Sequence, residues 1–87
     1  MTRITYTKSF LKSVQKLPKV IQEKLAKQLE IVSQNPFSSL LHSKPLVAEL
    51  AGFYSFRITR EWRVIFCFTD PEVIKLVDVA NRKDIYK

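Results

Sequence analysis

Apolar and polar side chains alternate through residues 52–68, and this alternation is the clearest structural signal in the chain. Because successive side chains of a strand point to opposite faces, the pattern predicts two strands joined by a tight connection. Both strands present their apolar side chains to the same face only if the connection has an odd length, most simply Thr59-Arg60-Glu61. This register places Arg57 directly opposite Arg63 on the other face. The shared apolar face consists of Tyr54, Phe56, Ile58, Trp62, Val64, Phe66 and Phe68.

The facing pair of Arg57 and Arg63 is the first candidate for chemistry. Like charges that face each other across two strands destabilise a sheet, so a pair kept in this position suggests a bound anion. The planar guanidinium group, with five donors, suits phosphate and often contacts it through two hydrogen bonds. From these residues alone, an equally good interpretation is that both side chains turn into solvent or pair with carboxylates such as Glu49.

Earlier in the chain, apolar residues recur at helical spacing and predict a hairpin of two helices. Thr7 is a suitable N-cap for a helix over residues 8–16. Pro18 suits the first position of a second helix that extends to about residue 33, before an Asn-Pro step that ends it. The two apolar stripes consist of Phe10, Val14 and Leu17, and of Ile21, Leu25, Leu29 and Val32.

Lysines form a second stripe on the first predicted helix, at Lys8, Lys12 and Lys16. A solvated helix face is the common reason for such a stripe. The functional alternative is contact with a nucleic-acid backbone, for which Lys83 near the C-terminus is a further candidate.

The remaining segments complete an α+β fold in the order β-α-α-β-β-β. It has a mostly antiparallel sheet with the helical hairpin packed on one face, and with Arg57 and Arg63 on the other face. The other predicted segments are a first strand at residues 2–6, a loop at 36–51 containing a short strand at 46–50, a turn at Asp70-Pro71-Glu72, a last strand at 73–79 and a polar tail at 80–87.

Size, charge and cysteine content narrow the class of protein. With 87 residues, one domain over residues 1–87 is expected. The formal charge of +7 predicts an acidic partner such as nucleic acid or an acidic protein. The single Cys67 and single His give no familiar zinc spacing, and no metal or cofactor is expected. No secretory signal and no bilayer-spanning apolar run is seen, so we expect a cytoplasmic protein without a membrane partner.

The order of these elements, together with short stretches of sequence, resembles toxins of the RelE/ParE superfamily from bacterial type II toxin–antitoxin systems. The resemblance covers nearly the whole chain and rests on the order and spacing of several pieces. Residues 52–66 are closest to the YoeB-like branch, whereas the Arg-Lys-Asp-Ile-Tyr ending is closer to RelE-like members. The pieces are Lys12–Pro18, Asn35-Pro36, Lys44-Pro45-Leu46, Leu50-Ala51-Gly52, Tyr54–Phe66 and Asn81–Tyr86.

This resemblance implies a microbial ribonuclease (RelE-like) fold and cleavage of mRNA, often in the ribosomal A site and without a metal. The substrate's 2′-hydroxyl attacks the adjacent phosphate, so the reaction needs a base, donors for the developing charge and an acid for the leaving oxygen. It also implies a cognate antitoxin, and the +7 charge predicts that the wrapping segment of that antitoxin is acidic.

Four residues match positions that carry catalysis in such toxins. By resemblance, Arg63 stabilises the transition-state phosphate and Arg57 orients it. Arg82 assists phosphate or leaving-group chemistry, and Tyr86 stacks on a base or places the leaving oxygen. Arg82 could instead be a surface charge beside Asp84, and the Tyr86 ring could instead pack against the sheet.

The chain departs from these relatives at the positions that supply the general base. Phe56 replaces a lysine of RelE-like members, Lys44 replaces a glutamate of YoeB-like members, and no histidine precedes Tyr86. Lys44 and Glu49 are the main candidates for the base, with His42 third. A lysine acts as a base near neutral pH only when burial or positive neighbours disfavour its charge. Glu49 could equally form an ion pair with Arg57 or Arg63.

Two other functions remain open from the sequence. The missing base residues favour somewhat a gyrase inhibitor of the ParE branch, which shares the fold without a ribonuclease site, whereas the run of residues 55–63 favours the ribonuclease branch. A basic module that binds RNA or an acidic protein without catalysis is the third hypothesis.

Overall fold

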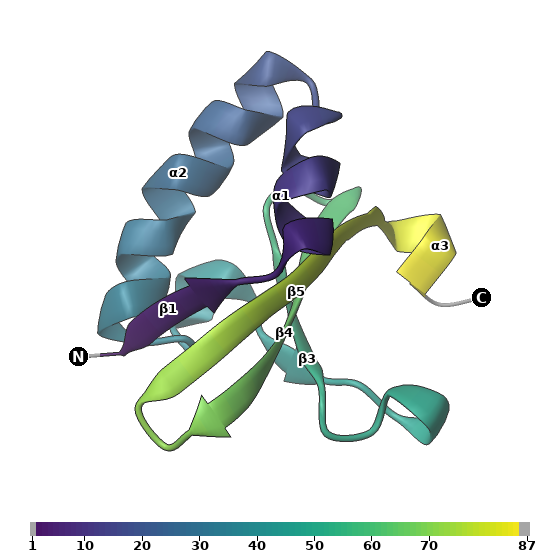
Figure 1. Ribbon diagram of the computed structural model, residues 1–87. Coiled ribbons are helices and arrows are strands. Elements are labelled where there is room, and N and C mark those ends of the chain that lie inside the picture. Colours follow the sequence, from purple (N-terminus) through teal and green to yellow (C-terminus); the bar gives the residue numbers. More distant parts are fainter. Residues whose placement is uncertain (1, 86–87) are drawn as a thin grey trace.

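A computed structural model describes residues 2–85 of the chain. The elements, in chain order, are β1 (Arg3–Tyr6), α1 (Lys8–Gln15), α2 (Lys19–Gln34), the short 3-10 helix η1 (Ser39–Leu41), β2 (Lys44–Pro45), the 3-10 helix η2 (Ala48–Leu50), β3 (Tyr54–Arg57), β4 (Trp62–Asp70), β5 (Val73–Asn81) and α3 (Arg82–Ile85). The strands form one sheet in the order β1-β5-β4-β3-β2, with α1 and α2 over one face (Figure 1).

The sheet is antiparallel except for its first pair. β1 lies parallel to β5, whereas β5, β4, β3 and β2 each run antiparallel to the next. The predicted α+β class is therefore confirmed, as is the register that places Arg57 opposite Arg63. None of the helices within residues 2–85 is long and apolar enough to cross a bilayer.

Local sequence explains where the two long helices begin and end. The side-chain oxygen of Thr7 accepts a hydrogen bond of 3.0 Å from the N–H of Phe10, so Thr7 is the N-cap of α1 as predicted. Pro18 is the N-cap of α2, one position earlier than expected, and the helix begins at Lys19. Asn35 takes an extended conformation and ends α2.

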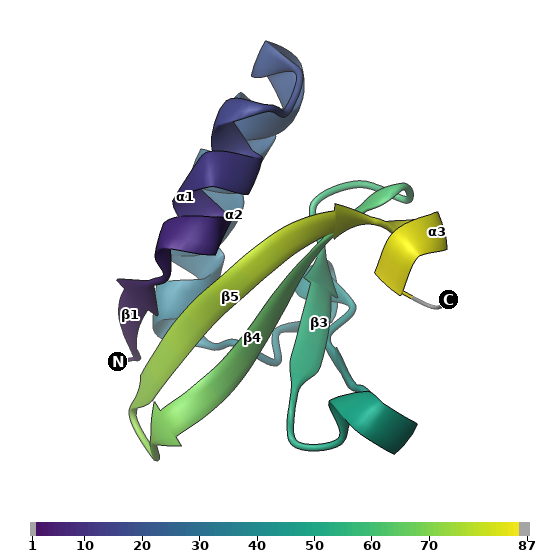
Figure 2. The same cartoon turned by 45° about the vertical axis from the view of Figure 1, so that its right-hand side comes forward.

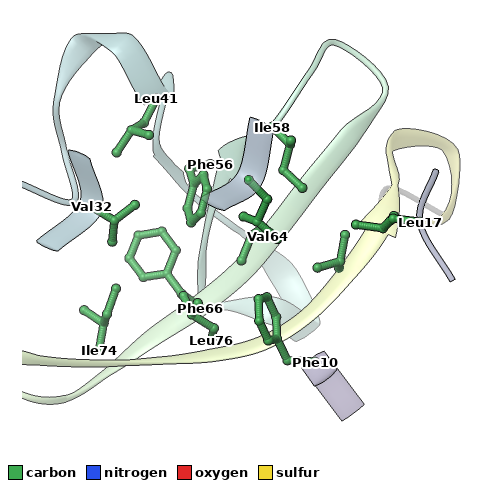
Figure 3. Packing of buried hydrophobic residues seen from close by; sticks show 12 residues of the cluster. Phe10, Leu17, Val32, Leu41, Phe56, Ile58, Val64, Phe66, Ile74 and Leu76 are labelled. Carbon is green, nitrogen blue, oxygen red and sulfur yellow. The ribbon is translucent and has the colours of Figure 1, made fainter. Parts of the chain in front are cut away.

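The apolar faces of the sheet and the helical hairpin meet in one cluster. Phe56, Val64 and Phe66 of the sheet are fully buried. Figure 3 shows the ring of Phe66 between Val32 of α2 and Ile74 of β5. Burial of such side chains is the main favourable term in folding, so this cluster fixes how the sheet sits against α1 and α2.

Two predicted segments were placed wrongly. The strand expected at residues 46–50 is absent, because β2 lies earlier at Lys44–Pro45 and residues 48–50 form η2. Ala48 has a positive φ of 57°, which an extended strand cannot contain. The prediction of a polar tail from residue 80 is also wrong. β5 continues to Asn81, and α3 follows it directly (Figure 2).

Candidate active site

An open groove of about 750 Å³ lies where β3 passes into β4. Its walls come from α2, the segment between α2 and β2, the β3–β4 hairpin and the start of α3. Among the lining residues that the structure describes there is no Asp or Glu. We call this site the basic groove, because it is lined by Lys24, Gln28, Leu40, His42, Lys44, Arg57, Ile58, Thr59, Arg60, Arg63 and Arg82.

The sheet register places the two central arginines side by side in the basic groove. Arg57 of β3 faces Arg63 of β4, and facing residues of antiparallel strands have Cα atoms about 4.5–5.5 Å apart. Arg63 is only 3% exposed, so it does not turn into solvent as one interpretation of the sequence proposed. Within residues 2–85, the buried Nε of Arg57 has no hydrogen-bond partner. An anion in the groove would offset the repulsion between the two charges.

Backbone contacts bring Arg82 to the same groove. The N–H of Arg82 donates a hydrogen bond of 2.7 Å to the carbonyl of Glu61, at the end of the β3–β4 connection. The N–H of Lys83 donates to Oδ1 of Asn81 and helps to turn the chain from β5 into α3. Arg82 is therefore held beside the hairpin that carries Arg57 and Arg63. Tyr86, the fourth residue inferred from the resemblance, lies outside the described residues.

The structure separates the candidates for the general base. Lys44 begins β2, pairs with Ser55 of β3 and lines the basic groove. Glu49 lies on η2, is exposed and is not among the lining residues. His42, the third candidate, lines the groove.

The lysine stripe on α1 does not join the groove. Lys8, Lys12 and Lys16 are all exposed, and neither they nor Lys83 are among the lining residues. Any contact they make with nucleic acid would lie outside the basic groove. No group of three His, Cys, Asp or Glu side chains within residues 2–85 is placed to hold a metal ion.

Sequence reasoning missed the wall that α2 contributes. Lys24 and Gln28 are four residues apart, so they share one face of that helix. Their spacing was visible in the sequence, but the periodicity of a helix does not show which loop or strand its polar edge will meet. Arg60 was also missed as a groove residue, because it lies in the connection between the two strands.

Comparison with known proteins identifies the family. The sequence profile described as the YoeB-like toxin of bacterial type II toxin–antitoxin system matches residues 6–83. The chain belongs to this family. Among curated proteins, no sequence matches this YoeB-like toxin.

Solved structures share the fold of this YoeB-like toxin at low identity. YafQ from E. coli BL21(DE3) superposes with a TM-score of 0.79 at 19% identity and covers 100% of both chains. A YoeB/ParE toxin from Agrobacterium tumefaciens gives 0.77 at 21% identity and covers 93% of this chain and 99% of its own. The RelBE2 toxin–antitoxin complex from Mycobacterium tuberculosis gives 0.77 at 24% identity, covering 93% and 98%.

Replacing Arg57 by Met should stabilise this YoeB-like toxin. Methionine keeps an apolar stem but removes a buried, unpartnered Nε and one of two facing charges. We expect the free energy of unfolding to rise by about 1 kcal/mol, which is a rise in Tm of about 4–8 °C for a domain of this size. Thermal unfolding measures this directly.

The matched control for this experiment is Arg60→Met, at an exposed arginine of the same groove. Its free energy of unfolding should change by less than about 0.5 kcal/mol. A clear loss of stability in Arg57→Met would mean that attractive contacts within the protein hold Arg57 in place.

Proposed function

We propose that this chain is the toxin of a type II toxin–antitoxin system and acts as an endoribonuclease that cuts mRNA on translating ribosomes in the cytoplasm. One observation carries the proposal. Six cationic side chains converge on one groove around a facing arginine pair: Lys24, Lys44, Arg57, Arg60, Arg63 and Arg82. A surface of this kind is suited to the phosphates of a nucleic acid.

The proposed reaction is an internal transesterification of RNA that needs no metal ion. The 2′ oxygen forms a bond to phosphorus while the bond from phosphorus to the 5′ oxygen breaks, leaving a 2′,3′-cyclic phosphate. Negative charge develops on the phosphoryl oxygens, and donors placed before the reaction stabilise it. Arg63 would stabilise this charge, Arg57 would orient the phosphate, and Arg82 would act on the side of the leaving oxygen.

The partner that we propose is an antitoxin with an acidic segment. The RelBE2 structure of M. tuberculosis and the YoeB–YefM structure of Staphylococcus aureus are toxin–antitoxin complexes that share this fold. In this chain, a carboxylate-rich segment would complement the basic groove and the formal charge of +7. An antitoxin whose wrapping segment is net positive would contradict this part of the proposal.

The proposal is tested by inducing the chain alone in a bacterial host and mapping the 5′ ends of abundant mRNAs within minutes. We expect growth arrest and new 5′ ends inside translated codons. A copy of one reporter mRNA without its start codon serves as the matched control, and it should remain intact if cleavage requires the ribosome. Arrest with intact mRNA and gyrase-linked DNA breaks would replace the proposal with gyrase inhibition. Binding to ribosomal RNA with neither arrest nor cleavage would indicate a non-catalytic module.

A further inference from the structure

The basic groove holds many groups that attract a phosphate but few that can take a proton. Six of its lining side chains are Lys or Arg, whose cationic groups donate hydrogen bonds and offer no acceptor atom. The hydroxyl oxygen of Thr59 already accepts hydrogen bonds from the N–H groups of Glu61 and Trp62. The amide of Gln28 is not basic, and Leu40 and Ile58 are apolar. Among the lining residues that the structure describes, His42 is the side chain best suited to accept a proton.

The backbone holds His42 in one place. Leu41 before it is fully buried in the core. The hydroxyl of Ser43 after it donates a hydrogen bond of 2.6 Å to the carbonyl of Pro36. His42 itself has a φ of 52°, in the left-handed region that non-glycine residues seldom occupy. Such strained positions concentrate at functional sites, and here the flanking anchors keep an exposed imidazole on a fixed backbone.

His42 lines the same groove as the arginine pair. It precedes β2, which begins at Lys44 and faces Ser55 of β3. Arg57 of β3 in turn faces Arg63 of β4. A phosphate held by the two arginines would therefore have its ribose in the groove that the imidazole also lines.

We propose that His42 is the general base of the RNA cleavage, an inference that rests on the proposed function. The unprotonated imidazole nitrogen takes the proton of the 2′-hydroxyl as the 2′ oxygen bonds to phosphorus. The bond to the 5′ oxygen breaks, and that oxygen takes a proton from solvent water in the open groove. His42 then releases its proton to solvent. The products are a 2′,3′-cyclic phosphate and a free 5′-hydroxyl, and no other reactant is needed.

The test compares single-turnover cleavage of an mRNA on programmed ribosomes by the full chain and by His42→Asn. Asparagine tolerates a positive φ, so this substitution removes the base while keeping the backbone conformation. We expect the cleavage rate to fall by about 10²- to 10⁴-fold. Affinity for the same mRNA with a 2′-deoxy nucleotide at the cut site, which cannot react, should stay within about threefold.

Two further measurements separate proton transfer from a structural role. Free imidazole should partly restore cleavage by His42→Gly, which also accepts a positive φ. The dependence of the cleavage rate on pH should also differ between the wild type and His42→Asn, because the variant lacks the group that takes the proton. Since the chain has a single histidine, no other imidazole can produce these signals.

The outcomes of this experiment distinguish the role of His42 from the proposed ribonuclease function. Wild-type cleavage with equal cleavage by His42→Asn would overturn the role of His42 and leave the ribonuclease function standing. A loss confined to Lys44→Met, with His42→Asn fully active, would assign the base to Lys44 instead. A wild-type chain that cuts no mRNA under any of these conditions would remove the proposed function and this inference together.

Discussion

Replacing Arg63 by Ala should slow cleavage of ribosome-bound mRNA by about 10³-fold. Arg63 is only 3% exposed, lines the basic groove and faces Arg57. Its fork of donors is already in place before the reaction, so the negative charge that develops on phosphate meets a fixed positive group rather than mobile water. The measurement is the single-turnover rate, with circular dichroism and an unfolding curve to show that the variant remains folded.

Two variants sharpen this experiment. Arg63→Lys keeps the charge but loses the planar fork, so most of the activity should still be lost. Arg3→Ala removes an exposed arginine from β1, the strand at the opposite edge of the sheet from β2, and should cleave at the wild-type rate. Full activity in a folded Arg63→Ala variant would exclude a catalytic role for this residue.

The arginine pair could be predicted from the sequence because strand alternation is a local rule. Once the apolar face of residues 54–68 was assigned, the odd-length connection left little freedom in the register, and Arg57 had to face Arg63. The contribution of Lys24 and Gln28 could not be predicted in this way. It depends on how α2 packs against the sheet, and that geometry is set by core side chains from many parts of the chain.

Replacing Phe66 by Ala should lower the free energy of unfolding by about 3–5 kcal/mol. Phe66 has no exposed surface, and its ring centroid lies 5.6 Å from that of Tyr54 and 5.9 Å from that of Phe56. Small domains have total stabilities of about 5–10 kcal/mol, so most of the stability of this chain would be lost. Denaturation by urea measures the change.

A second phenylalanine of the same aromatic cluster provides the matched control. Phe37 stacks against Phe68 with ring centroids 5.8 Å apart, but it is 49% exposed. Phe37→Ala should therefore cost about 1 kcal/mol, because half of its surface is already in water. Equal losses in Phe66→Ala and Phe37→Ala would mean that the core is less well packed around Phe66 than its burial indicates.

The errors in predicting the fold have a common physical origin. Residues 46–50 are rich in apolar side chains, which suggested a strand, but only Leu46 among them is buried and Ala48 turns the backbone into the left-handed region. The polar residues after Val79 suggested a tail, yet β4 extends far enough to pair with β5 as far as Asn81. In both cases contacts with distant residues outweighed the local pattern.

The parallel pairing of β1 with β5 sets the order in which this protein can assemble during its own synthesis. β1 precedes the other described strands in the chain, but β5, its neighbour in the sheet, is the last strand within residues 2–85, and Arg82 of the basic groove follows β5. Pairings between segments so distant in sequence form late in folding. The basic groove therefore cannot be complete until Arg82 has been synthesised, so a nascent chain that stops before this residue lacks one of the groove's walls.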